Sequence, residues 1–97
     1  MKPLKEIKII RKIKDENGKR IKIKVLFKLF KKNSRTSYIV VILKSHNLLG
    51  EDTEWRYSTE LSISKYSTSV FVVEPFDLDC PYRKTAARWA IENTRKI

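Results

Sequence analysis

Hydrophobic and polar residues alternate along two neighbouring segments near the start of the chain. Residues 5–14 and 20–31 carry Ile, Val, Leu or Phe at many alternate positions, and the stretch DENGK lies between them. A period of two places successive side chains on opposite faces of a strand, and Asn-Gly between such runs is typical of a tight turn. We therefore predict a β-hairpin.

The register of this hairpin can be chosen from its polarity. A two-residue Asn-Gly loop would set Ile13 beside Lys22 and mix polar with apolar residues on both faces. A three-residue loop that begins at Glu16, with Gly18 at positive φ, sets Ile13 opposite Ile21 instead. We adopt the second register because it gathers the isoleucines on one face.

Three more strands and a helix are predicted downstream. Residues 38–43, YIVVIL, form a continuous apolar run suited to a central strand covered on both faces. A polar turn at 47–54 precedes an alternating strand that reaches residue 64, and residues 69–74 read as a fifth strand. From Pro81 onward the chain is rich in alanine and lacks glycine, which predicts a helix capped by Asp79 or Cys80.

These elements define the expected architecture. We predict one α+β domain, residues 1–97, in which an antiparallel five-stranded β-meander is followed by one C-terminal helix packed on the sheet. A chain of 97 residues suits one modest core.

Charge is distributed unevenly along the chain. The net charge is +11, and residues 1–44 hold 15 Lys and Arg against 3 Asp and Glu, whereas residues 45–97 hold 7 against 8. Such one-sided basicity indicates a polyanionic partner. The alternative is that lysine only solubilises the chain.

The chosen register collects cations on one side of the hairpin, which we call the basic face. It consists of Lys8, Lys12, Lys14, Arg20, Lys22, Lys24 and Lys28, interrupted by Ile10, Leu26 and Phe30. Like charges directly opposite each other destabilise a sheet, so this arrangement favours a bound anion over solvated lysines. The following loop adds cations next to hydroxyl and amide donors, which suits a phosphate backbone. We predict phosphate contacts from Lys12, Lys14, Arg20, Lys22, Lys24, Lys32 and Arg35.

Secondary contacts are predicted from Phe30 and from the helix. Phe30 either stacks on a base or packs as core under the helix. Lys84 and Arg88 lie towards one side of the helix, where they contact phosphate or complement the helix dipole. Three other aromatic residues, Trp55, Tyr57 and Trp89, are expected in the core, with base stacking as the alternative.

The residues that catalysis requires are scarce. His46 is the single histidine and is expected to be polar surface. Cys80 is the single cysteine, and we expect a structural thiol; the alternative is a reactive thiol whose pKa is lowered by the helix start and by Arg83 and Lys84. Three acids, Glu74, Asp77 and Asp79, suit turn formation and capping better than Mg²⁺ binding. We therefore expect no enzymatic activity, no metal and no cofactor.

These observations favour a small basic nucleic-acid-binding protein whose contacts with DNA or RNA are electrostatic and weakly sequence-specific. The alternative is a virus- or mobile-element-encoded effector or inhibitor that docks on an acidic surface of a host protein. One cysteine and the absence of a long apolar run indicate a cytoplasmic protein without membrane association. Exposed strand edges leave open whether two copies pair into a homodimer.

Overall fold

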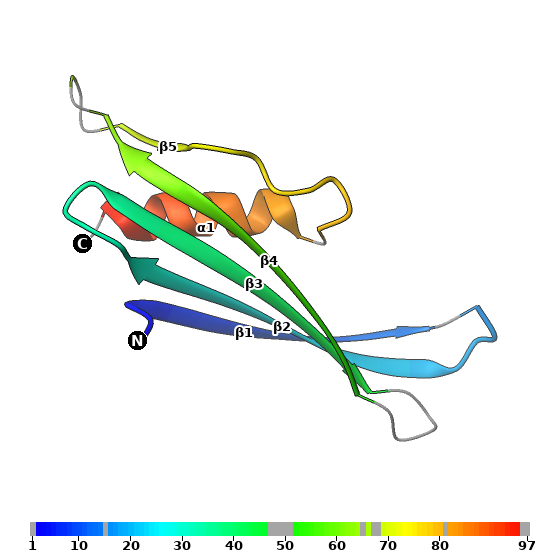
Figure 1. The fold of residues 1–97 in the computed structure, drawn as a ribbon. Coiled ribbons are helices and arrows are strands. Elements are labelled where there is room, and N and C mark those ends of the chain that lie inside the picture. Colours follow the sequence, from blue (N-terminus) through cyan, green and yellow to red (C-terminus); the bar gives the residue numbers. More distant parts are fainter. Residues whose placement is uncertain are drawn as a thin grey trace.

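The computed structural model describes residues 2–14, 16–46, 52–64, 66, 69–80 and 82–95. Its elements follow in chain order as β1 (Lys5–Lys14), β2 (Arg20–Lys31), β3 (Thr36–His46), β4 (Asp52–Ile63), β5 (Val70–Val72) and α1 (Arg83–Arg95). The strands form one antiparallel sheet in the order β1-β2-β3-β4-β5, and α1 packs on one side of it (Figure 1). The predicted α+β meander is confirmed.

The predicted register of the first hairpin is also confirmed. Ile13 pairs with Ile21 and Lys12 pairs with Lys22 along the β1–β2 ladder. Gly18 has a φ of 76°, the left-handed conformation that a glycine adopts without a Cβ penalty. Asp15, on the other side of the turn, lies outside the described residues.

The core lies between α1 and the face of the sheet that we call the helix face. It is lined by alternate residues of the three central strands, all buried: Val25, Phe27, Leu29, Ile39, Val41 and Leu61. Ala86 and Ala90 of α1 are also buried, and their small side chains allow the helix to approach the sheet closely. Trp89 covers Phe27 with ring centroids 5.8 Å apart.

Near the end of α1, a polar contact joins the helix to the sheet. The buried hydroxyl groups of Ser37 and Thr94 lie 3.2 Å apart and share a hydrogen bond. A buried hydroxyl without a hydrogen-bond partner would destabilise the folded protein. This bond therefore holds the end of the helix over β3.

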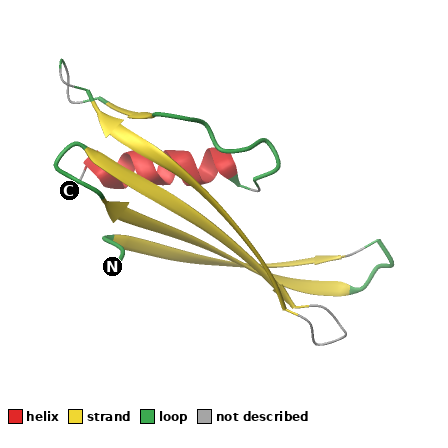
Figure 2. Ribbon diagram, in the orientation of Figure 1, coloured by secondary structure: helices red, strands yellow, loops and turns green. Residues whose placement is uncertain are grey.

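The sheet is much longer than the helix that covers it. Strands of ten to twelve residues span about 33–40 Å, whereas a helix of 13 residues spans about 20 Å. The molecule therefore measures 52 × 26 × 17 Å, and its radius of gyration of 15.4 Å exceeds the roughly 12.5 Å of a compact chain of this length. Figure 2 shows the end of the β1–β2 hairpin reaching well past α1.

Three predicted strands differ from those observed. β3 is longer than residues 38–43, and α1 covers its helix face; on the opposite face Tyr38 and Val40 are half-buried and Ile42 is buried, with no second helix over it in the described part of the chain. β4 begins at Asp52, inside the predicted turn, because the polar residues 52–54 pair with β3 residues 44–46. β5 is limited to 70–72, and residues 47–51 of the turn lie outside the described residues.

The helix begins later than the predicted cap. Its first residue is Arg83, and Tyr82 immediately before it has a φ of 59°, which is unusual for a residue other than glycine. Asp79 and Cys80 therefore precede the first helical turn rather than capping it, and Pro81 is outside the described residues. The described part of the chain contains no helix that is long and apolar enough to cross a membrane.

Candidate nucleic-acid interface

The basic face is the side of the β1–β2 hairpin opposite the helix face. In β2 the buried residues Val25, Phe27 and Leu29 face the core, so the alternate positions between them point the other way. The register of β1 places its even-numbered residues on the same side. Six of the seven cations predicted for this face are exposed, and Lys28 is half-buried.

Cations oppose one another at the far end of this face. Lys12 lies across from Lys22, and Lys14 lies across from Arg20. None of the seven cations forms an ion pair with any acid in the part of the chain that the structure describes. These four cations, which flank the turn, therefore have no ion-paired acid within the described ranges.

This charged end is also the narrowest part of the sheet. The β2–β3 ladder stops at Ile23, so among the residues that the structure describes, β2 beyond this point pairs with β1 alone. The residues of this two-stranded tip are 12–14 and 20–22, which include four of the predicted phosphate contacts. A two-stranded ribbon of this kind is narrow enough to approach a nucleic-acid groove.

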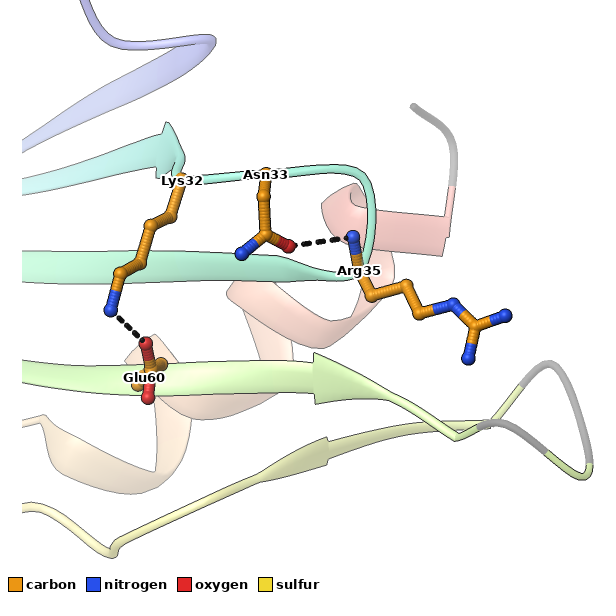
Figure 3. Close-up of polar contacts among 4 residues, drawn as sticks. All are labelled: Lys32, Asn33, Arg35 and Glu60. Carbon is orange, nitrogen blue, oxygen red and sulfur yellow. Dashed lines mark hydrogen bonds and ion pairs between the residues drawn. The ribbon is translucent and has the colours of Figure 1, made fainter.

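Lys32 and Arg35 lie at the opposite end of the sheet. The ten residues from Lys22 to Lys32 correspond to about 33 Å of extended chain. Lys32 Nζ lies 3.0 Å from Glu60 Oε1, while the Arg35 side chain points away from both (Figure 3). The backbone N–H of Arg35 donates to Asn33 Oδ1 at 3.0 Å, which shapes the turn. The seven predicted contacts therefore form two separate groups.

Acidic residues bound the basic face on its β4 side. Lys44 Nζ lies 3.6 Å from Glu54 Oε1, and Arg56 Nε lies 3.3 Å from Glu54 Oε2. The hydrogen bond from Arg56 is the main cause that lowers the pKa of Glu54. Lys44 and Arg56 are thus ion-paired, in contrast to the seven cations of the basic face, for which the described residues supply no ion pair.

Phe30 lies on the side of the sheet opposite the helix, so its predicted alternative as core under the helix is wrong. Its ring stacks on Tyr38, with centroids 4.9 Å apart and planes 13° apart. Tyr38 is not among the residues predicted for this site. The signal was available, because residues 30 and 38 are equally distant from the centre of the β2–β3 turn and must therefore pair.

The three aromatic residues that were expected in the core lie on the helix side of the sheet, which excludes them from the basic face. Trp89 packs on Phe27, as expected of a core residue. Tyr57 is half-buried, and burial raises its phenol pKa, with Asp79 adding to the effect. Trp55 is 42% exposed, because it lies on the part of the sheet that α1 does not reach.

The helix cations are remote from the basic face. Lys84 and Arg88 are exposed on α1, and α1 covers the opposite side of the sheet. A ligand on the basic face therefore cannot contact these two residues without wrapping around the molecule.

Cys80, the cysteine considered as a reactive group, is buried. Burial raises the pKa of the Cys80 thiol to about 11, with a smaller contribution from Asp79, so the predicted lowering by Arg83 is outweighed. Among the described residues, no three His, Cys, Asp or Glu side chains are grouped so that they could hold a metal ion. The side chain of His46 is outside the part that can be described.

Function must be inferred from the residues of this chain. Comparisons with protein-family models, with curated proteins and with solved structures found no match.

Proposed function

We propose that this protein binds nucleic acid through the basic face of its N-terminal hairpin. The observation that carries the proposal is the pairing of Lys12 with Lys22 and of Lys14 with Arg20, without an acidic partner among the described residues. Directly opposed like charges destabilise a sheet. Phosphate groups between these side chains would convert the repulsion into attraction.

The chemistry of such binding is mainly electrostatic. Cations that neutralise phosphates release condensed counterions, so affinity falls steeply as salt is added. Lysine dominates the basic face, and lysine acts as a mobile point charge rather than as a planar fork that reads base edges. We therefore expect this protein to bind nucleic acids with little preference for their base sequence.

The predicted contacts differ in how well they are placed. Lys12, Lys14, Arg20, Lys22 and Lys24 share one continuous surface and form the proposed site. Lys32 is already paired with Glu60, and Arg35 extends from the far turn, so these two contribute only to a ligand that spans the sheet.

The test compares two triple variants of equal charge. The first variant alters the basic face and carries Lys12→Glu/Lys22→Glu/Lys24→Glu. The second variant alters α1 and carries Lys84→Glu/Arg88→Glu/Arg95→Glu. In each variant, three charge reversals lower the net charge of +11 by six units. The hairpin variant should lose DNA and RNA binding, with the salt slope reduced by roughly 2–3 if each contact contributes about 0.7–0.9. The α1 variant should bind nearly as the wild type does.

Retention of wild-type affinity by the hairpin variant at low salt would refute the proposal. Equal losses in the two variants would show that net charge matters and that the basic face does not. Circular dichroism of both variants confirms that each comparison is made between folded proteins.

The second candidate is a protein partner with an acidic surface, and the same basic face supports it. A pull-down from host extract distinguishes the two. Tight, salt-resistant capture of one acidic protein, with negligible binding of oligonucleotides, would favour an effector or inhibitor encoded by a virus or mobile element.

Self-association through the free edge of β1 is opposed by charge. Residues 5–14 contain five cations and one acid, so two β1 strands in contact would repel each other. We therefore propose a non-catalytic, monomeric binding protein that works in the cytoplasm, and sedimentation at low and high salt tests its oligomeric state.

A further inference from the structure

An aromatic stack stands on the same side of the sheet as the basic cations. Phe30 of β2 and Tyr38 of β3 are cross-strand neighbours, and both are half-buried. Their nearly parallel rings, 4.9 Å apart, are in contact across the two strands. One face of the Phe30 ring is therefore covered by Tyr38, and its other face is directed towards β1.

β1 does not cover that second face. The strand begins at Lys5, which pairs with Leu29, so no residue of β1 lies across from Phe30. Leu4, the next residue back along the chain, borders a hollow on the helix face together with Ile63 and Thr94. The Leu4 N–H donates to Leu29 O at 2.7 Å, yet Phe30 is only half-buried, so part of its ring stays accessible on this side of the sheet.

Apolar residues connect this stack to the cations. Leu26 and Val40 are half-buried on the same side of the sheet, and Ile42, which lies directly across from Leu26, is buried there. Lys8 and Lys24 lie next to this apolar stripe, as close neighbours of Leu26 in the register. Bases and phosphates would therefore meet different, adjacent parts of one surface.

We infer that the ligand of this face is single-stranded nucleic acid, with one base stacked on the open face of Phe30 and the backbone following the hairpin cations. The inference rests on the proposed function and narrows it. A duplex keeps the faces of its bases stacked internally, so it presents phosphates and groove edges but no free base face that could stack on Phe30. From Phe30 to Arg20, β2 spans about 33 Å. This length suits single-stranded nucleic acid of the ~4–16 nucleotides that one OB-fold binding module covers.

The experiment measures binding of one labelled oligonucleotide in two forms. A mixed-sequence strand of about twelve nucleotides is titrated alone and annealed to its complement, at equal ionic strength. Phe30→Leu removes the ring and keeps an apolar side chain of similar volume, which preserves the fold. Phe71→Leu is the matched control, because Phe71 is an exposed phenylalanine at the opposite edge of the sheet, on β5.

The wild-type protein should bind the single strand more tightly than the duplex. Phe30→Leu should weaken single-strand binding by roughly 5- to 140-fold, the effect of one stacked base, and leave duplex binding unchanged. Phe71→Leu should change neither affinity. Phe30→Trp should restore single-strand binding, and the fluorescence of the new tryptophan should be quenched by the single strand.

Each result supports or overturns a defined statement. Equal or tighter binding of the duplex, or equal losses for both forms in Phe30→Leu, overturns the single-strand inference and leaves the proposed function intact. Failure of the wild type to bind either form overturns both. Unquenched fluorescence in Phe30→Trp with the single strand bound shows that no base stacks there, and it too overturns the inference.

Discussion

Reversing the charge of Lys12 should make the protein more stable while it weakens nucleic-acid binding. Lys12 lies directly across from Lys22, so Lys12→Glu replaces a repulsive cross-strand pair with an attractive one. Cross-strand charge pairs are worth about 0.2–1 kcal/mol in either direction, which gives a total change of about 0.4–2 kcal/mol. Both side chains are exposed, so solvent screening favours the lower half of this range.

The matched control is Lys28→Glu, the same substitution at another position of the same face. Lys28 lies across from Glu6, so this variant creates a pair of opposed acids and should lower stability. Both variants remove one cation from the basic face and reduce the net charge equally. A general relief of self-repulsion in a +11 protein would therefore stabilise both, whereas cross-strand pairing predicts opposite signs.

Thermal unfolding at low and high salt is the assay. A gain of about 0.5–1 kcal/mol raises the midpoint by roughly 2–8 °C in a domain of this size, and salt should erase most of it. Shifts of the same sign in Lys12→Glu and Lys28→Glu, or a gain that persists in about 1 M salt, would refute the argument from opposed charges.

Three further predictions concern the core. Ser37→Ala should lower the free energy of unfolding by about 1–3 kcal/mol because Thr94 loses its buried partner, and Ser37→Ala/Thr94→Val should recover much of that loss in urea titrations. Leu61→Ala should lower the free energy of unfolding by about 2–5 kcal/mol. Leu78→Ala, at a side chain that is 83% exposed, should change it by less than about 0.5 kcal/mol, and equal losses in the two variants would contradict the assignment of Leu61 to the core. The Cys80 thiol should react slowly with a thiol reagent at pH 8 until the protein unfolds. Its pKa in the folded protein, about 11, lies above the ordinary 9.0. The contribution of Cys80 to the free energy of unfolding should therefore be constant below about pH 9 and fall as the pH rises towards 11.

The hairpin was predictable because its information is local. Alternation in β1 and β2 identified the strands, and only one register placed Ile13 opposite Ile21. The start of β4 was missed because Asp52, Thr53 and Glu54 resemble a turn, although pairing with β3 holds them extended.

The candidate site was predictable only in part, because its limits depend on strands that are distant in sequence. The sequence alone does not show that Lys32 has an acidic partner, because Glu60 is brought beside it by the pairing of β3 with β4. Similarly, the side on which Phe30 lies was undecided until α1 was placed against Phe27 and Leu29. Local periodicity reveals that two faces exist, but tertiary packing decides which of them is covered.

The order in which the chain is synthesised adds a consequence for the helix face. About 30 residues separate Leu61 from Ala90, so at roughly 5–20 residues per second the ribosome needs ~1.5–6 s to supply α1 after the fourth strand. During that interval the nascent meander has an apolar face in contact with water. Its lysine-rich side and the cationic edge of β1 repel other nascent chains for as long as that face is bare.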